Sequence, residues 1–339
     1  MILPFVVEPS AMEELPGRDE AERALHRVLL STWKELGVVV VETDNVRGTD
    51  LFRAIDRLHQ SVRKYWKELL VSRRRFRKAR RDWPGFRDAP LEDLRALDGD
   101  ALLAIVSADT AKEAGVSGEQ TGTLEGTDLE LARFPLLPDA RSIAKIRRLR
   151  QQDIPAGTTV REAWERWFLP HAELAQSVVV VDRYAGRQLV TRDNLHRLKR
   201  ESGLARFLGF LERVPSIRSV KLIVAEGAGT DGVAREHVQA ALQQLVGHTT
   251  WAALGTFEAY VVDDDRFKGA YHDRYVRFDS VRIQVGPGLE IFGGERLSRP
   301  AQYSVGPGSK EARKAARAIE DSITGDTPAW RPTARQRGR

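Results

Sequence analysis

The chain has 339 residues, of which 42% are hydrophobic, and this length favours two compact domains over one. It contains no cysteine, which excludes disulfides, iron–sulfur clusters and thiolate zinc sites. Lysine and arginine (54) exceed aspartate and glutamate (48), so the net charge is +6. No apolar run approaches the roughly 18 residues of a membrane span. We therefore expect a cytoplasmic protein without a transmembrane segment.

The first part of the chain alternates predicted strands with predicted helices. Runs of β-branched residues predict buried strands, and apolar residues at helical spacing predict helices. In chain order these are a strand at 2–9, a helix at 19–36, a strand at 38–42, a long helix from 50 into a basic stretch, and a strand at 102–109. This order is typical of an α/β layer, and we expect an α/β domain over residues 1–158.

The positive charge is concentrated in residues 63–81, which we expect to continue the long helix. This stretch holds ten basic residues and one acid, Glu68, with Tyr65, Trp66 and Phe76 interleaved. Cations for phosphates and aromatic surfaces for bases favour nucleic-acid binding without sequence reading. A solvated helix face or contact with an acidic membrane surface would also suit this charge. The candidate nucleic-acid-binding residues are Arg73, Arg74, Arg75, Arg77, Lys78, Arg80 and Arg81.

Three acidic residues follow or end predicted strands of this domain: Glu8, Asp44 and Asp109. Their placement resembles the pattern of PIN-type nucleases, in which acidic residues from several strand ends hold Mg²⁺ or Mn²⁺. The first position is Glu where that pattern usually has Asp. The alternative is that these side chains cap helices and solvate loops. A divalent ion at this set is the only cofactor that the sequence suggests.

A predicted helical connector at 159–177 leads into a second α/β domain at 178–323. Its expected strands are 177–184, 220–225, 256–263, 271–278, 281–286 and 289–292, and its expected helices are 191–213, 231–246 and 309–323. The remaining residues, 324–339, contain two prolines and several arginines, and we expect a mobile basic tail.

The strand expected at 271–278 carries the residues with the clearest chemistry. His272 and Arg274 are two positions apart, so their side chains point to the same face of a strand. A guanidinium can grip a phosphodiester with two hydrogen bonds, and an imidazole beside it can attack phosphorus or protonate a leaving oxygen. Asp279 completes a His-x-Arg-x4-Asp pattern. A purely structural role is the alternative for such a pair.

Two separated motifs resemble one known family. The stretch HDRYVRFDSVRIQVGPGLEIF, which begins at His272, resembles the phospholipase-D-like C-terminal domain of MIT-domain proteins. The stretch VVDRYAGRQL at 180–189 resembles the opening strand of the same domain. The resemblance covers roughly residues 178–323. It implies that Asp182, Tyr184 and Arg187 lie at the mouth of one phosphate- or ligand-binding site with His272 and Arg274.

More broadly, the set His272, Arg274 and Asp279 resembles the His-x-Lys-x4-Asp signature of phospholipase D and related nucleases, with Arg in place of Lys. In that superfamily two copies of the motif meet at one active site, which needs no metal. Only one copy is present here, so the resemblance implies that catalysis would require a homodimer. The relatives that share the Arg resemble binding modules, which leaves open whether this chain is an enzyme.

Two hypotheses therefore stand. The first is a nucleic-acid-directed nuclease or phosphodiesterase of a bacterial defence-type system, acting through His272. The second is a non-catalytic adaptor whose second domain binds an acidic ligand or a partner protein of a multi-gene system. The lysine-to-arginine replacement at Arg274 is the feature that separates them, because it favours binding over hydrolysis.

Overall fold

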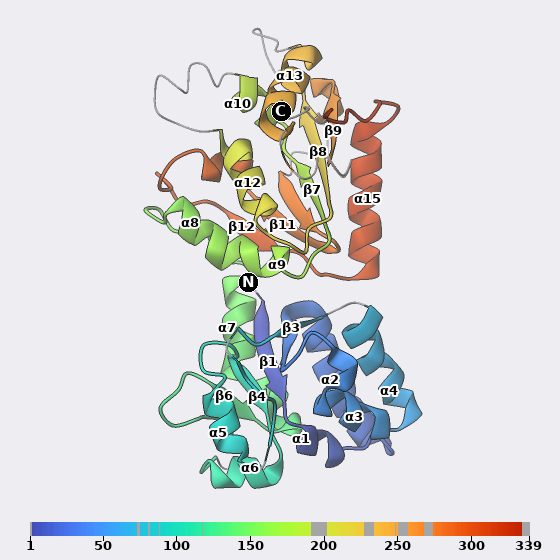
Figure 1. The fold of residues 1–339 in the computed structure, drawn as a ribbon, viewed down its shortest axis with the longest axis vertical. Coiled ribbons are helices and arrows are strands. Elements are labelled where there is room, and N and C mark those ends of the chain that lie inside the picture. Colours follow the sequence, from blue (N-terminus) through green and yellow to red (C-terminus); the bar gives the residue numbers. More distant parts are fainter. Residues whose placement is uncertain are drawn as a thin grey trace, which may run out of the picture. The chain divides into compact units, whose positions relative to one another are not determined.

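The computed structural model describes residues 2–72, 75–80, 82–87, 89–116, 118–190, 202–226, 234–247, 249, 257–267 and 274–333. The chain divides into two compact units, Met1–Leu149 and Arg150–Arg339 (Figure 1). Each unit has one six-stranded mixed sheet with helices around it, which confirms the α/β class expected from the sequence. The first unit ends at Leu149, whereas the sequence predicted a first domain that extends to residue 158.

The first unit is built on a largely parallel sheet. Its strands are β1 (Leu3–Val7), β2 (Gly37–Val41), β3 (Phe76–Lys78), β4 (Leu103–Ile105), β5 (Gly122–Thr123) and β6 (Glu130–Ala132). Its helices are α1 (Pro9–Glu13), α2 (Glu20–Leu36), α3 (Asp50–Arg57), α4 (Gln60–Lys67), α5 (Pro90–Arg95), α6 (Ala108–Glu113) and α7 (Arg141–Leu149). The strand order is β3-β2-β1-β4-β6-β5, with β5 antiparallel to its neighbour.

The valine run of β2 explains how this sheet is held. Val39 and Val41 face one hydrophobic core, and Val40 faces another on the opposite side. Successive side chains of a strand point to opposite faces, so a strand covered on both sides must be apolar throughout. In the first of these cores Trp33 of α2 packs edge-on against Phe5, with ring centroids 5.8 Å apart.

The prediction of a basic helix over residues 63–81 is wrong. Helix α3 ends at Arg57 and α4 at Lys67, and a π-helical turn follows at Glu68–Ser72. The chain then forms β3, which pairs in parallel with β2. The backbone N–H of Val39 donates to the carbonyl of Arg75 (3.1 Å), so pairing with a strand far away in sequence outweighs the local helical tendency.

The second unit has a sheet with a parallel half and an antiparallel half. Its strands are β7 (Ser177–Val181), β8 (Ser219–Ala225), β9 (Phe257–Val262), β10 (Tyr275–Phe278), β11 (Val281–Val285) and β12 (Tyr303–Val305). Its helices are α8 (Val160–Ala163), α9 (Leu169–Ala172), α10 (Ala185–Val190), α12 (Gly203–Glu212), α13 (Arg235–Val246) and α15 (Lys310–Thr324). The order is β12-β11-β10-β7-β8-β9, with β7, β8 and β9 parallel and β10 antiparallel to β7.

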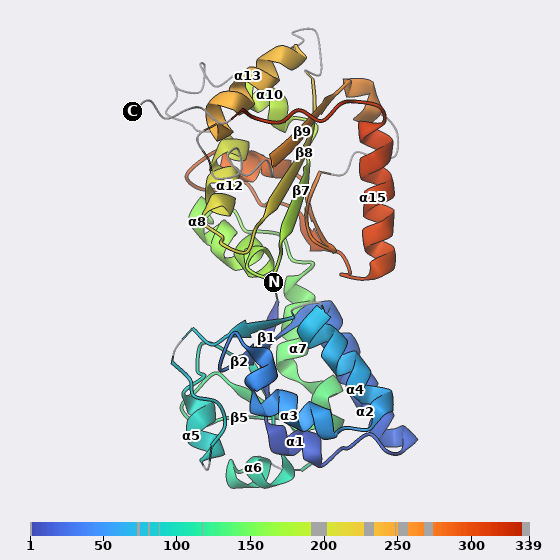
Figure 2. The same ribbon diagram turned by 45° about the vertical axis from the view of Figure 1, so that its right-hand side comes forward.

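The two faces of this sheet are covered differently. Helix α15 lies along one face, and α8, α10, α12 and α13 lie on the other (Figures 1 and 2). The segment expected as a connector at 159–177 belongs to the larger core of this unit. In that core Phe168 packs against Phe292 with ring centroids 5.2 Å apart, and Trp164 stacks on Phe210 at 5.1 Å.

A buried ion pair fastens α15 to the sheet. Arg277 of β10 and Glu320 of α15 are 4% and 3% exposed, and two guanidinium nitrogens of Arg277 donate to the carboxylate at 2.6 and 2.7 Å. The hydroxyl of Tyr275 lies 3.5 Å from the same carboxylate. Burial and the charge of Glu320 both raise the pKa of this tyrosine. The charged pair is therefore enclosed by β10 and α15 together.

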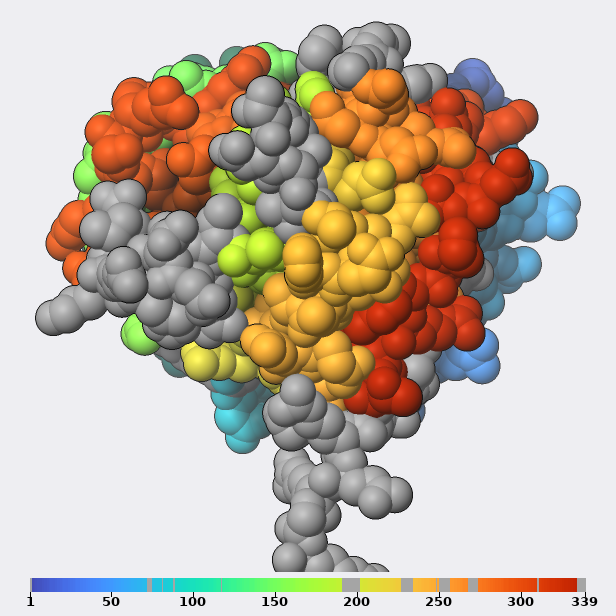
Figure 3. Space-filling model, turned by 90° about the horizontal axis from the view of Figure 1, so that it is seen from above, coloured from blue at the N-terminus to red at the C-terminus, as the bar shows by residue number. Residues whose placement is uncertain are grey.

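The residues that follow α15 are held against the sheet as far as Thr333, unlike the mobile tail expected from 324 onward. Trp330 and Ala259 of β9 exchange backbone hydrogen bonds of 2.8 and 2.9 Å. The backbone N–H of Thr333 donates to the side chain of Gln243 in α13 (2.9 Å). In Figure 3 this segment, in red, lies beside α13 in yellow and orange. It thus covers the β9 edge.

Candidate anion-binding site in the second unit

The candidate site lies where the beginning of β10 meets the end of β7. The two strands are antiparallel, with Tyr275 opposite Val181, so Arg274 and Asp182 are brought to the same end of the sheet. His272 lies outside the described residues. The strand at 271–278 was expected to carry both side chains, and the structure describes it from Arg274 onward.

Asp182 is the buried member of the site, with 3% of its surface exposed. Its carboxylate accepts hydrogen bonds from the backbone N–H of Leu289 (2.7 Å) and of Tyr184 (3.0 Å). Burial raises the pKa of Asp182, and these hydrogen bonds and the charge of Arg274 act in the opposite direction. Asp182 therefore positions the neighbouring backbone and stands next to the guanidinium of Arg274.

Arg274 is half-buried, and one of its guanidinium nitrogens is engaged by the protein. Its Nη1 donates to the carbonyl of Pro287 (3.0 Å), and its guanidinium lies 5.1 Å from the ring centroid of Tyr184. This is the only hydrogen bond recorded for the guanidinium in the part of the chain that is described. Arg183 lies 5.6 Å from the same ring, but it is ion-paired with Asp264. Arg274 thus retains N–H groups that can meet an anion.

Gly288 allows the parts of the site to approach one another. Its φ is +65°, and a Cβ there would lie 2.3 Å from Oδ2 of Asp182 and 2.8 Å from Cδ of Arg274. The residues that follow form a 3₁₀ turn, Gly288–Phe292, where the sequence predicted a strand at 289–292. The prediction was wrong because the left-handed glycine and the bond from Leu289 to Asp182 turn the chain away from the sheet.

Asp279 lies at the other end of β10 from Arg274. It has a φ of 48°, and it accepts the backbone N–H groups of Gln176 (3.1 Å) and Ser177 (3.0 Å) and the hydroxyl of Ser177 (2.8 Å). Its carboxylate therefore fixes the start of β7. The structure brings Asp182, Tyr184 and Arg274 together and places Asp279 apart from them. Arg187 lies on α10 with its side chain exposed.

The acidic residues of the first unit have different surroundings from one another. Glu8, 4% exposed, follows β1 and accepts from the backbone N–H of Ser107 (2.8 Å), the hydroxyl of Thr110 (2.8 Å) and two serine hydroxyls. Asp44 and Asp109 are exposed. Over the described ranges no three acidic or histidine side chains are grouped to hold a metal ion. Binding of Mg²⁺ or Mn²⁺ at Glu8, Asp44 and Asp109 stays a prediction.

A pocket of about 320 Å³ in the first unit includes Glu8 among its lining residues. Acidic and basic side chains balance in its lining, which holds Glu8, Glu13, Asp50, Arg53, Arg57 and Arg87. Arg53 is paired with Asp50, and Arg57 with Glu13. The pocket therefore offers compensated charges and lacks the excess of one sign that would select an ion.

The basic stretch is divided between structural and exposed residues. Nη2 of Arg77 donates to the backbone carbonyl of Asp100 (2.5 Å), and the backbone N–H of Arg80 donates to the side-chain carboxylate of Asp100 (3.1 Å). Lys78 is exposed at the end of β3. Trp66 is fully buried, whereas Tyr65 is 48% exposed. Arg73, Arg74 and Arg81 lie outside the described residues. Arg75 contributes its carbonyl to Nε1 of Trp33 (2.8 Å).

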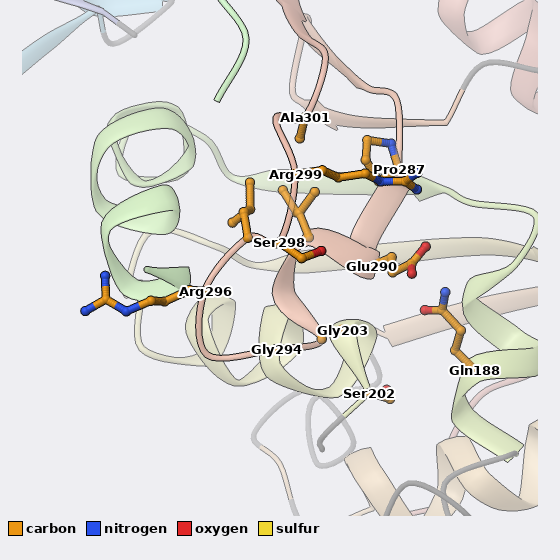
Figure 4. A pocket seen from close by; sticks show the side chains of 13 residues that line it. Gln188, Ser202, Gly203, Pro287, Glu290, Gly294, Arg296, Ser298, Arg299 and Ala301 are labelled. Atoms are coloured by element: carbon orange, nitrogen blue, oxygen red, sulfur yellow. The ribbon is translucent and has the colours of Figure 1, made fainter. Parts of the chain in front are cut away.

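Sequence reasoning missed a pocket beside Arg274, which has a volume of about 240 Å³. Its lining includes Gln188, Pro287, Glu290 and Arg299 (Figure 4). The glycines at 286–294 are the only signal in the sequence, since they indicate a turn that can enclose space.

A second missed group lies at the ends of β8 and β9. Arg235 is placed between Glu226 (3.2 Å) and Asp263 (3.5 Å). Burial and a hydrogen bond with Asp263 raise the pKa of Glu226. Two carboxylates so close share one guanidinium, which balances part of their charge.

No family model and no curated protein matches the chain. None of the helices in the described residues is long and apolar enough to cross a membrane.

Proposed function

We propose that the second unit binds a phosphate group of nucleic acid at Arg274, and that the protein is directed to nucleic acid through this site. The observation that carries the proposal is the state of Arg274. It is anchored at one nitrogen by Pro287, lies against the ring of Tyr184, and keeps its other donors for a ligand. A guanidinium fixed in this way matches two phosphate oxygens with little loss of side-chain freedom on binding.

Two further features favour nucleic acid over a small anion. Tyr184 is 37% exposed beside Arg274, and an exposed ring next to a guanidinium suits a base adjoining the bound phosphate. In the first unit the exposed Lys64 offers the same pairing of cation and ring, since its ammonium lies 4.8 Å from the ring centroid of the exposed Tyr65. Both units would then contact the backbone without reading its sequence.

A second candidate function is cleavage of the bound phosphodiester. His272 precedes Arg274 by two residues, which is the spacing that puts both side chains on one face of an extended chain. Cleavage would use two copies of His272 in a homodimer, one attacking phosphorus and the other protonating the leaving oxygen. The remaining alternative is a non-catalytic adaptor, in which Arg274 holds an acidic ligand or an acidic group of a partner protein.

Binding can be tested by fluorescence anisotropy with a labelled single-stranded oligonucleotide. Arg274→Ala should weaken binding by about tenfold or more, because a hydrogen bond to a charged group is lost. Arg213→Ala is the matched control, since Arg213 is exposed on the same unit at the end of α12. If the two variants bind the oligonucleotide with equal affinity, Arg274 is not the phosphate-binding residue.

Cleavage is tested separately with the same oligonucleotide. If His272 is the nucleophile, His272→Ala abolishes turnover and leaves binding in place, and the wild type accumulates a phosphohistidine. A wild type that binds but never cleaves single-stranded DNA, duplex DNA or RNA, with or without Mg²⁺, would be a binding module.

A further inference from the structure

The pocket adjoins the proposed phosphate site through one shared residue, Pro287. Pro287 lines the pocket, and the carbonyl of the same residue accepts the hydrogen bond from Arg274 (3.0 Å). A strand whose phosphate lies at Arg274 would therefore pass a neighbouring group across the mouth of the pocket.

The walls of the pocket combine an apolar surface with a few polar groups. The apolar part comes from Pro287, Ile291, Leu297 and Ala301. Glu290 and Arg299 are exposed, and their side chains make no hydrogen bond or ion pair within the described part of the chain. Figure 4 shows the polar ends of Glu290 and Gln188 turned toward each other, with Arg299 extending toward Pro287.

These groups restrict what the pocket can hold. The carboxylate of Glu290 needs hydrogen-bond donors from its ligand, whereas Arg296 and Arg299 of the same lining need an acceptor. A group that offers both donors and an acceptor therefore fits better than a second phosphate, which offers acceptors alone and would be repelled by Glu290. A carboxylate only accepts hydrogen bonds, and its two oxygens are best satisfied by two neighbouring N–H donors. The apolar wall suits the flat face of a base better than the hydroxyls of a sugar.

Guanine presents the matching pattern. Its Watson–Crick edge carries two adjacent donors, the ring N1–H and the 2-amino group, next to the carbonyl oxygen O6. Glu290 can accept from both donors, and the guanidinium of Arg299 can donate to O6. The Watson–Crick edge is free only in an unpaired base, so the strand must be single at this position.

We propose that the pocket lined by Gln188, Glu290 and Arg299 binds an unpaired guanine of the strand whose phosphate lies at Arg274. This inference rests on the proposed function, because the phosphate contact places the strand. It adds a base preference to a site that otherwise reads only the backbone.

The test compares three labelled single-stranded thymine oligonucleotides that carry one central guanine, inosine or adenine. Inosine lacks the 2-amino group and retains N1–H and O6. We expect the guanine strand to bind about tenfold more tightly than the inosine strand, because one charge-assisted hydrogen bond is lost. The adenine strand should bind still more weakly.

The key variant is Glu290→Gln, which replaces one accepting oxygen with a donor. It should abolish the preference for guanine over inosine, so that the dissociation constants of the two strands differ by a factor of about one. Glu295→Gln is the matched control, since Glu295 is exposed in the same loop and does not line the pocket. It should retain the preference.

The outcomes separate the inference from the proposed function. Binding that depends on Arg274 but shows no base preference would overturn the guanine pocket and leave the phosphate site standing. A preference for ribose over deoxyribose strands that ignores the base would also overturn it, since the pocket would then hold a sugar. If no strand binds to the wild type, both proposals fail.

Discussion

The backbone N–H of Leu289 donates a 2.7 Å hydrogen bond to the carboxylate of Asp182, and this bond ties the turn after β11 to the end of β7. The two residues are more than one hundred positions apart in the chain. Gly288 directly precedes Leu289, and its lack of a side chain leaves room for the carboxylate of Asp182. The position of Arg274 depends on this arrangement, because its hydrogen-bond acceptor is the adjoining Pro287.

Replacing Gly288 with alanine should therefore damage the site and the fold together. The added Cβ would lie 2.3 Å from Oδ2 of Asp182, and the residue would keep a positive φ. We expect a loss of about 2 kcal/mol or more in the free energy of unfolding, measured by urea denaturation. Gly209→Ala is the control, since a Cβ at that helical position meets nothing within 4 Å. It should leave stability unchanged or raise it, and equal losses would contradict this account.

Asp182 should make stability depend on pH in a defined direction. Burial raises its folded pKa above the ordinary value of an aspartic acid, about 3.9, so the folded state binds the proton more readily than the unfolded chain. Its contribution to stability is fully present below that ordinary pKa and is lost as the pH rises through the raised one. Asp182→Asn removes this titration. The free energy of unfolding of the wild type minus that of the variant should fall across this window, and a constant difference would show that the pKa is not raised.

Removing only one member of the ion pair between Arg277 and Glu320 should destabilise the protein strongly. Each single variant, Arg277→Met or Glu320→Leu, leaves an unpaired charge in a buried place, and we expect each to lose about 3–5 kcal/mol of unfolding free energy. The double variant should lose much less than the sum of the two. Chemical denaturation of all four proteins gives the coupling energy, and additive losses would show that the two side chains act independently.

The basic stretch should separate into binding and structural residues. Replacing Arg73, Arg74 and Lys78 together with alanine should weaken nucleic-acid binding and make its dependence on salt shallower, by about 0.7 in slope for each lost phosphate contact to a single strand. Arg77→Ala should instead destabilise the first unit, because Arg77 holds the carbonyl of Asp100. Lys145→Ala, on the exposed side of α7, serves as the control for lost charge. An unchanged salt slope in the triple variant would exclude this stretch as a contact surface.

The buried strands could be predicted from the sequence because their signal is local. The valine runs that became β2 and β7 are continuous, which is the pattern of strands covered on both faces. The order of strands and helices likewise led to two α/β sheets. These predictions needed only neighbouring residues.

The errors arose where distant residues decide the local structure. The basic stretch was predicted as helix because nothing in its own composition indicates that Phe76 will pair with Val39. Residues 289–292 were predicted as a strand because they are apolar, but Gly288 and Asp182 turn them into a 3₁₀ helix.

The candidate site was predicted in part. The resemblance named Asp182, Tyr184 and Arg274, and the structure brings these three residues together. Glu290 lies in the stretch that carries the resemblance, but it was not assigned to a site. Arg299 gave no signal, because a pocket in a loop has no periodicity in sequence.

The pairing of Trp330 with Ala259 also affects whether the protein can associate with other chains through its sheet edge. Strand β9 ends the sheet, and an uncovered edge offers its backbone N–H and C=O groups to any extended chain that meets it. Here the chain supplies its own cover through two backbone hydrogen bonds and the side chain of Arg331 on Glu258. A protein shortened after Thr324 would bare that edge, and its tendency to aggregate would rise before its fold was lost.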